Sequence, residues 1–300
     1  MVKNKKIKRL WAGNTGGGTV GQRLLIIFFR WFNLRLGYAV MAVVVPFYML
    51  FARKGYLAIY HYFRRHFDYL KWKSFLKTYQ NHFFFGKIIL DRFAVFAGKK
   101  QLFNIEIIGN EYFTELLNKD KGFVIIGSHV GNFEIAGYFL SQNKKTINAM
   151  IYGGETQTVQ QNRSKLLSNN NINLISVKSD MSHLFAANTA LQKGEIVSMP
   201  ADRLFGSTKA VECDFLQGRA DFPIGAFALA AGFDVEVRAI FCIKISSKKY
   251  KIYVIPIGSS GSFATKKEKI NEMVFSYVKE LENIVKQYPE QWFNFYEFWK

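Results

Sequence analysis

Residues 122–137, GFVIIGSHVGNFEIAG, decide the fold of this chain. The apolar run 123–126 is bounded by glycines, a pattern typical of a buried parallel strand. The residues that follow, 132–140, have helical rather than alternating periodicity. His129 therefore falls where the carboxyl end of a strand turns into a helix. This is the edge of an open α/β sheet at which ligands usually bind.

Strand-like and helical segments alternate from residue 102 onward, and this predicts an α/β fold with a mixed, mostly parallel sheet flanked by helices. The strand-like runs are 103–108, 123–127, 146–152, 172–177, 195–200, 235–245 and 250–257. Pro223 and Gly232 fit a helix that begins and ends at those points. Apolar residues on one helical face of 266–288 predict a helix that packs across the domain and ends at Pro289.

His129 and Glu134, which falls in the first turn of the predicted helix, are suited to removing a proton from an alcohol. A neutral imidazole titrates near working pH, and a carboxylate behind it fixes its tautomer and stabilises the imidazolium. The hydroxyl could then attack an acyl carbonyl directly, with backbone N–H groups near Gly131 stabilising the oxyanion. The alternative is that His129 is a buried core histidine and Glu134 an unrelated carboxylate, because that arrangement would have the same spacing. Dinucleotide, P-loop and zinc-protease motifs fit the stretch less well.

Arg163, Asp202 and Arg203 also lie near predicted strand ends, on the same rim as His129, so they could converge on one pocket. The planar fork of arginine makes paired, charge-assisted hydrogen bonds to phosphate or carboxylate. We expect Arg163 and Arg203 to contact a headgroup or phosphopantetheine, with Asp202 orienting them. An ordinary surface ion pair is the alternative for Arg163.

Composition indicates an anionic partner, because 41 Lys and Arg against 22 Asp and Glu give a formal charge of +19. Nucleic acid, an anionic membrane, a phosphorylated lipid and an acidic carrier protein all qualify. Basic residues interleaved with many aromatics favour a membrane, and no nucleic-acid-binding signature is present. The two cysteines lack disulfide-framework or metal-ligand spacing, and His61 and His66 lack a third ligand, so we expect no metal and a reducing cytoplasmic setting.

Four segments are expected. Residues 1–22 form a basic, glycine-rich tail with no signal-peptide cleavage site. Residues 23–55 form a membrane anchor helix kinked by Pro46, whose cleanest apolar stretch, 36–52, is just long enough to span a bilayer. Residues 56–100 form a basic, aromatic helical platform, and 101–300 the catalytic domain. Residues 1–22 could be a flexible tail or could touch anionic headgroups with Trp11 at the interface. A buried core helix is the alternative for 23–55, and a solvated basic helix is the alternative for 56–100.

The block HVGNFE, residues 129–134, resembles the H-x-x-N-W/F-E signature of the bacterial lipid A late acyltransferases (lauroyl and myristoyl acyltransferases), a branch of the lysophospholipid acyltransferase superfamily. Residues 199–231 resemble that family's downstream segment, and PEQWFNFYEFW, 289–299, resembles its end. The resemblance runs from about residue 20 to the carboxyl terminus. It implies that His129 is the general base and Glu134 its partner. We also expect Gly131 and Asn132 to bind substrate.

These observations predict a membrane-associated acyltransferase that moves a fatty acyl group from acyl carrier protein, or coenzyme A, to a hydroxyl of a lipid A-type acceptor. No cofactor is expected beyond this acyl donor. The resemblance places the enzyme at the inner membrane with its catalytic domain facing the cytoplasm. An acyltransferase for an aminolipid, a lysophospholipid or an aryl-polyene-type lipid is the first alternative. A non-catalytic membrane protein that binds anionic lipid is the second.

Overall fold

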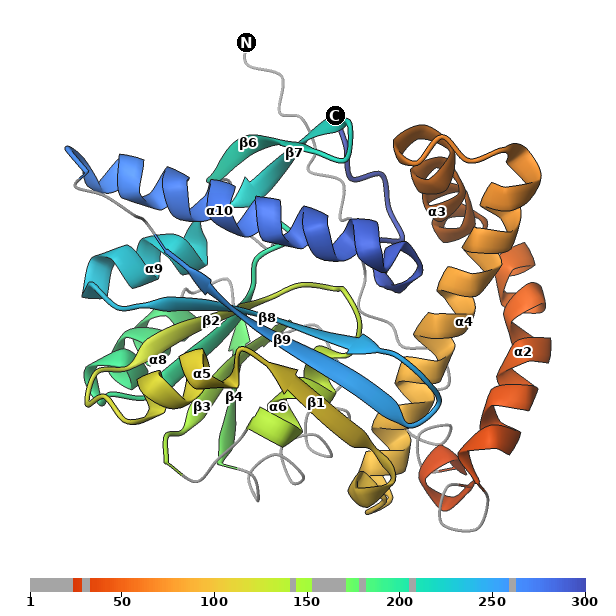
Figure 1. Ribbon diagram of the computed structural model, residues 1–300, viewed down its shortest axis with the longest axis horizontal. Coiled ribbons are helices and arrows are strands. Elements are labelled where there is room, and N and C mark those ends of the chain that lie inside the picture. The colour runs from red at the N-terminus through yellow and green to blue at the C-terminus, as the bar shows by residue number, and fades with distance from the viewer. Residues whose placement is uncertain are drawn as a thin grey trace.

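The computed structural model describes residues 24–28, 33–140, 144–152, 171–177, 182–204, 209–258 and 263–300 (Figure 1). The expected tail 1–22 and Arg163 lie outside these residues. The strands are β1 (Asn104–Ile108), β2 (Phe123–Gly127), β3 (Ile147–Tyr152), β4 (Ile172–Val177), β5 (Ile196–Pro200), β6 (Ala210–Phe215), β7 (Gly218–Pro223), β8 (Val237–Lys244) and β9 (Lys249–Ile257). The α-helices are α2 (Leu34–Phe51), α3 (Arg53–His66), α4 (Lys71–Phe96), α5 (Asn110–Leu117), α6 (Phe133–Leu140), α8 (Ser182–Gln192), α9 (Gly225–Phe233) and α10 (Lys266–Gln287). Short 3-10 turns cover Lys100–Leu102 and Pro289–Gln291.

The main sheet has the described strand order β1-β9-β8-β2-β5-β3-β4. Its pairings are parallel except for the antiparallel pair of β8 with β9. The predicted mixed, mostly parallel α/β sheet is therefore confirmed. Each of the seven strand-like runs in the sequence coincides with a strand of this sheet, with bounds that differ by at most two residues.

A separate hairpin of β6 and β7 was not predicted. Its antiparallel register pairs Phe215 with Gly218, so the turn contains only Leu216 and Gln217. Both turn residues have positive φ, 48° and 61°. Two-residue hairpin turns of this kind usually contain Asn-Gly or Asp-Gly, which makes them recognisable in a sequence. Leu-Gln carries no such signal, so the hairpin could not be recognised from the sequence.

The sheet lies between two apolar layers. Alternate residues of β2 point to opposite faces, with Val124 and Ile126 in one buried cluster and Phe123 and Ile125 in the other. The first cluster includes side chains of α9 and α10, and the second includes side chains of α5 and α6. Figure 1 shows α9 and α10 on the opposite side of the β8–β9 pair from α5 and α6. A strand covered on both faces can be apolar throughout, as residues 123–126 are.

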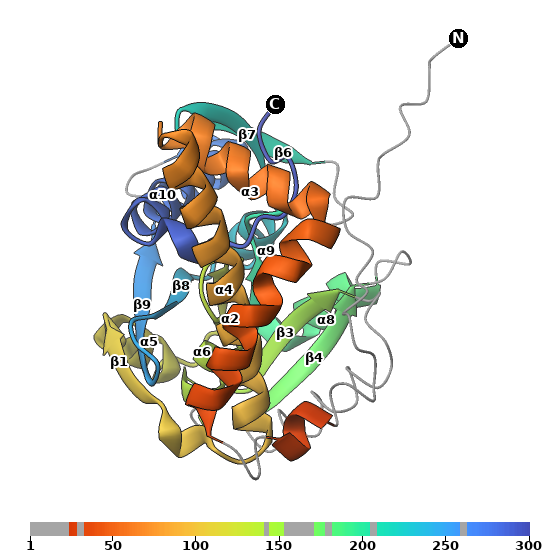
Figure 2. The ribbon, with the colours of Figure 1, turned by 90° about the vertical axis from the view of Figure 1, so that its right-hand side faces the viewer.

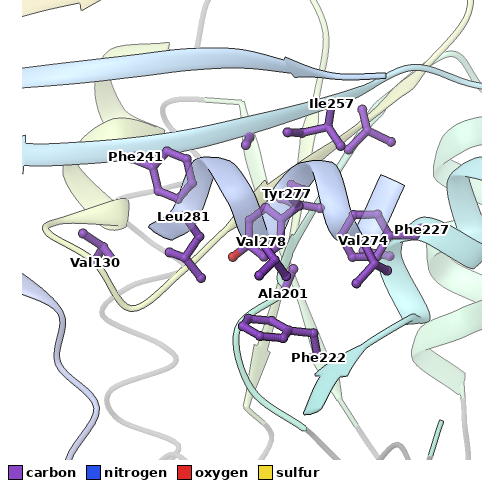
Figure 3. Packing of buried hydrophobic residues seen from close by; sticks show 14 of the residues in the cluster. Val130, Ala201, Phe222, Phe227, Phe241, Ile257, Val274, Tyr277, Val278 and Leu281 are labelled. Atoms are coloured by element: carbon purple, nitrogen blue, oxygen red, sulfur yellow. The ribbon is translucent and has the colours of Figure 1, made fainter. Parts of the chain in front are cut away.

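Helix α10 crosses the domain as its pattern predicted. Its N-cap is Thr265, whose side chain accepts from the backbone N–H of Glu268 while the Glu268 carboxylate accepts from the backbone N–H of Thr265. This capping box satisfies the first turn of the helix. Figure 3 shows the buried side chains of Val274, Tyr277 and Leu281 along the core-facing side of α10.

Helices α2, α3 and α4 form a group at one side of the sheet, with α2 lying along α4 (Figures 1 and 2). The two helices approach closely at Gly86, where a Cβ atom would lie 2.6 Å from Met41 Cγ. Helix α2 continues through Pro46, which has no N–H for the carbonyl of Ala42. The hydroxyl of Tyr79 on α4 donates to that carbonyl at 3.2 Å. The proline's missing hydrogen bond is therefore supplied by the neighbouring helix.

Helix α2 is, among the described helices, the one that is long and apolar enough to cross a bilayer, with 18 residues and a mean hydropathy of 1.8. Only 22% of these residues are buried. Its outer surface exposes large apolar side chains at Val43, Phe47, Leu50 and Phe51. The apolar amino-terminal helix that was predicted is therefore present, and most of it is uncovered.

A buried ion pair joins α4 to the sheet. Lys244 Nζ at the end of β8 lies 2.5 Å from Asp91 Oδ2, and both side chains are almost completely buried. The hydroxyls of Tyr38, on α2, and Tyr250, on β9, also donate to Asp91. Burial raises the pKa of Asp91 and lowers that of Lys244, while each opposite charge acts against that shift. Hydrogen bonds from three elements thus compensate the buried carboxylate.

Substituting Lys244→Met should destabilise the fold by about 3–5 kcal/mol, because it leaves a buried carboxylate without its cation. Arg219→Met is the matched control, since Arg219 forms exposed ion pairs with Glu212 and Asp214. Its cost should stay below about 1 kcal/mol. Denaturant unfolding of the two purified variants, followed by tryptophan fluorescence, measures the difference. Equal midpoints would contradict a structural role for the buried pair.

Candidate active site

The parallel register of β2 and β5 brings two functional side chains together. Gly127 at the end of β2 pairs with Pro200 at the end of β5, and the Ala201 N–H donates to the Gly127 carbonyl at 3.0 Å. Two residues beyond the paired ends, the chains carry His129 and Asp202. The prediction that Asp202 shares a rim with His129 is borne out by this pairing. It also explains why residues 73 positions apart meet.

Asp202 holds His129 at two points. Its Oδ1 lies 2.8 Å from His129 Nδ1, and its Oδ2 accepts from the backbone N–H of His129 at 2.8 Å. A carboxylate can only accept, so Nδ1 carries the proton and Nε2 has the free lone pair. The Asp202 side chain is 1% exposed, whereas the His129 side chain is 25% exposed. The imidazole is thus anchored from within and reachable from outside.

The charges at the site favour a neutral imidazole beside an ionised carboxylate. Burial alone raises the pKa of Asp202, but His129, its hydrogen bonds and the charge of Arg203 outweigh burial and lower the pKa to about 2. Burial lowers the pKa of His129; Asp202 acts in the opposite direction and Arg203 adds to the lowering. The net pKa of His129 is below its ordinary value. At neutral pH the ring can therefore accept a proton.

The loop after His129 is held by backbone hydrogen bonds on both sides. The Gly131 N–H donates to the Gln291 carbonyl at 2.8 Å, and the Asn132 N–H donates to the Cys242 carbonyl at 2.7 Å. Gly131 has a φ of +64°, and an added Cβ would lie 1.9 Å from the Cys242 oxygen. Glycine is therefore required for close packing. The expected oxyanion donors were backbone N–H groups near Gly131; of these, the Gly131 and Asn132 amides already have acceptors within the protein.

Asn132 likewise has a structural place. Its Oδ1 accepts from the Ile135 N–H at 3.2 Å, as a helix-capping side chain does at the start of α6. Its Nδ2 donates to the Tyr250 hydroxyl at 3.3 Å, and the residue is 2% exposed. Contact between Asn132 and substrate, as predicted, is not what this geometry provides. The side chain fixes the helix that follows the histidine.

Glu134 is not the carboxylate on His129 Nδ1. Its Oε1 accepts from Arg92 Nη1 at 3.0 Å, so Glu134 joins the first turn of α6 to α4. The expected pairing of Glu134 with His129 is therefore replaced by the pairing of Asp202 with His129. Spacing along the sequence favoured the nearer carboxylate, whereas the strand register delivers the distant one.

Arg203 lies beside this pair, as predicted. Its Nη2 donates to the Phe293 carbonyl at 2.6 Å, and its guanidinium is 5.4 Å from the centre of the Tyr296 ring. The charge of Arg203 acts on both His129 and Asp202. The Nη2 group of Arg203 is therefore already used in a hydrogen bond within the protein. Its position next to the imidazole nevertheless suits an anion bound there.

No residue of the segment 291–296 was predicted as a site residue. Besides the contacts of Gln291 and Phe293 with the histidine loop, Trp292 Nε1 donates to Asp202 Oδ2 at 3.4 Å. The block PEQW, residues 289–292, stands out in the sequence, but no periodicity in the sequence predicts that it contacts the loop of His129. Phe133, half exposed, adds an apolar surface next to the imidazole, with ring centres 6.3 Å apart.

Neither a metal centre nor a large cavity coincides with His129 among the described residues. No cluster of histidine, cysteine, aspartate or glutamate that could hold a metal occurs among the described residues. A cavity of about 420 Å³ lies elsewhere, between the β6–β7 hairpin and α10, and is lined by residues such as Glu212, Arg219 and Phe275. This cavity contains none of the site residues. We therefore locate the candidate site by the chemistry of His129 and Asp202 and not by the position of the cavity.

Comparison with known proteins gives a family. The sequence model described as "Bacterial lipid A biosynthesis acyltransferase" matches residues 83–300. No curated protein matches this chain. Among solved structures, the chain is similar to the 1-acyl-sn-glycerophosphate (LPA) acyltransferase PlsC from Thermotoga maritima, at 15% identity and a TM-score of 0.35, over 87% of this chain and 95% of that one. Since the family match covers more than half of the sequence, the chain belongs to the bacterial lipid A biosynthesis acyltransferase family.

Proposed function

We propose that this acyltransferase moves a fatty acyl chain from acyl carrier protein to a hydroxyl of a lipid A-type acceptor, with His129 as general base and Asp202 as its partner. The observation that carries the proposal is the 2.8 Å contact of buried Asp202 with the Nδ1 of a partly exposed histidine. Family membership supports the acyl transfer and the choice of acceptor.

The reaction needs one proton acceptor and one anchored carboxylate. His129 Nε2 takes the proton of the acceptor hydroxyl as its oxygen attacks the carbonyl carbon of the acyl thioester. A new C–O bond forms, and the tetrahedral intermediate then collapses with cleavage of the C–S bond. The imidazolium returns the proton to the leaving thiolate. Throughout, Asp202 keeps the proton on Nδ1 and stabilises the positive ring.

Two cationic residues are proposed to bind the charged parts of the substrates. Arg203 adjoins the imidazole, and its charge would stabilise the oxyanion or the phosphate of a phosphopantetheine arm. Arg163 is proposed for the same role. Glu134 is proposed to act through Arg92, fixing the start of α6 behind the histidine. Coenzyme A is the alternative donor, and the formal charge of +19 suits either an acidic carrier protein or a phosphorylated lipid.

We propose that α2 anchors the enzyme to the inner membrane, with the catalytic domain on the cytoplasmic side. The support is the uncovered apolar surface of α2, together with exposed Leu70, Trp72 and Phe75 at the start of α4. Large uncovered apolar surfaces mark membrane or protein contacts. Basic residues on α3 and α4 would meet anionic headgroups. Both described cysteines are free, in keeping with a reducing compartment.

His129→Ala should reduce acyl transfer by a factor on the order of 10²–10⁴, because the general base is lost. The assay combines purified full-length protein, acylated carrier protein and a lipid A precursor, with mass spectrometry of the product. His61→Ala, which removes a histidine on α3 that contacts Glu297, should keep activity. Full activity in His129→Ala would refute the mechanism. Lipid profiles of cells with and without the gene would identify a different acceptor.

Asp202→Asn should lower the rate by a factor on the order of 10²–10⁴ and also change its pH dependence. In the native enzyme the pKa of His129 is lowered, so the rate should be constant at neutral pH and fall only when the pH drops below that pKa. Removing the carboxylate removes an interaction that raises this pKa, so the acid limb should move to lower pH. Glu134→Gln, the control, should leave the limb in place. A limb that moves only in Glu134→Gln would identify Glu134 as the partner.

Val43→Asp combined with Phe47→Asp should release the protein from membranes, because each charge buried in the hydrocarbon costs about 2.5–3.5 kcal/mol. Phe185→Asp, which changes a similarly exposed aromatic residue on α8, is the control and should not. Sedimentation of membranes from expressing cells measures the distribution of each full-length variant. Unchanged sedimentation of the double variant would show that α2 is not the anchor.

A further inference from the structure

The segment 291–293 lies alongside the histidine loop and is joined to it by an isolated antiparallel β-bridge. Val130 and Trp292 form an antiparallel bridge. On either side of it, the Phe293 N–H donates to the His129 carbonyl at 2.9 Å and the Gly131 N–H donates to the Gln291 carbonyl at 2.8 Å. The Gln291 side chain in turn bonds both backbone groups of Lys244, each at 2.9 Å. The loop is thus fixed between β8 and this segment.

The indole of Trp292 reaches the same carboxylate as the histidine. Its Nε1 donates to Asp202 Oδ2 at 3.4 Å, and Trp292 is 1% exposed. A buried indole N–H needs an acceptor, because leaving it unsatisfied is costly. The ring itself cannot turn freely, since it packs against four aromatic rings with centres 5.0–5.7 Å away: Tyr62, Phe215, Phe298 and Trp299.

Asp202 consequently receives three donors, and they are divided between its two oxygens. Oδ2 accepts from the backbone N–H of His129 and from the indole N–H of Trp292. Oδ1 accepts from His129 Nδ1. Turning the carboxylate part of the way about its last bond would weaken all three contacts, and only a half turn, which exchanges two equivalent oxygens, would restore them. The two donors on Oδ2 therefore determine where Oδ1 meets the imidazole.

We propose that Trp292 is a positioning residue for acyl transfer, which holds the carboxylate of Asp202 through its indole N–H so that Asp202 orients His129. The inference rests on the proposed role of His129 as general base. Trp292 touches no substrate in this proposal. Its effect passes through Asp202 to the orientation and basicity of the imidazole, and so to the chemical step rather than to substrate binding.

Trp292→Phe tests the proposal, with Trp299→Phe as its matched control. Trp299 belongs to the same aromatic cluster, but its Nε1 donates to the Phe215 carbonyl at 2.8 Å instead of to Asp202. Both variants lose an indole N–H and similar apolar area. In Trp292→Phe, kcat should fall about tenfold with KM changed less than twofold, whereas Trp299→Phe should keep kcat within about twofold. Equal losses in the two variants, or a loss confined to KM, would overturn the proposal.

The pH dependence of kcat distinguishes a positioning role of Trp292 from a merely structural one, because loss of packing alone would not shift it. Without the indole donor more negative charge remains on Asp202, so the acid limb of kcat should move to higher pH in Trp292→Phe and stay in place in Trp299→Phe. NMR titration of the labelled histidines measures the same shift without substrate. An unmoved His129 titration in folded Trp292→Phe would count against the proposal.

A double-mutant cycle separates this inference from the proposed function. In an Asp202→Ala background, Trp292→Phe should cause no further loss of kcat, because the oxygens that accept from the indole are gone. If His129→Ala abolishes transfer but the kcat losses of the substitutions at Trp292 and Asp202 add, the positioning role of Trp292 is refuted and the role of His129 as general base is not. If His129→Ala is active, the proposed function itself is refuted. Should Trp292→Phe not fold, replacing Trp292 by 3-benzothienylalanine keeps the shape and removes the N–H. An unchanged kcat in that protein would overturn the inference.

Discussion

The site depends on the parallel alignment of β2 with β5. Because Gly127 lies opposite Pro200, the residues two positions beyond each strand emerge next to each other. One is a histidine and the other an aspartate, and their contact needs no long side chain or special loop. Two further bonds to the Gly127 carbonyl, from the Ala201 N–H and the Tyr277 hydroxyl, fix the point at which β2 ends. Any slip of this register would separate the pair.

Around this pair, a connected set of polar contacts holds the neighbouring helices and strands in place. Asn132 caps α6 and also meets the Tyr250 hydroxyl, which donates to Asp91. Asp91 in turn contacts Lys244 and Tyr38. A continuous set of buried hydrogen bonds therefore connects α2 with the loop that carries His129. Such networks are stabilising only when each member is satisfied, so they specify one arrangement of helices and sheet.

The sequence allowed the architecture to be predicted because strand-like runs alternate with helical segments, and because the central strand β2 is buried on both faces and reads as an apolar run. The same reasoning placed His129, Asp202 and Arg203 on one rim. It predicted Glu134 rather than Asp202 as the partner of His129, because the actual pairing depends on which strands are neighbours. The roles of Gly131 and Asn132 were also invisible, since they depend on the Cys242 carbonyl and the Tyr250 hydroxyl. The β6–β7 hairpin was missed because Leu216 and Gln217 form its turn without a glycine.

The strand-like contact of residues 291–293 with the histidine loop has a consequence for folding. Asp202 meets His129 across 73 sequence positions and Trp292 across 90, so the local formation of β2 and α6 cannot by itself produce a competent centre. Contacts of such large sequence separation form late, after the entropy of closing long loops has been overcome. A partly folded chain already attached to lipid would therefore carry an unoriented imidazole, and reactivity would appear only with the final docking of distant segments.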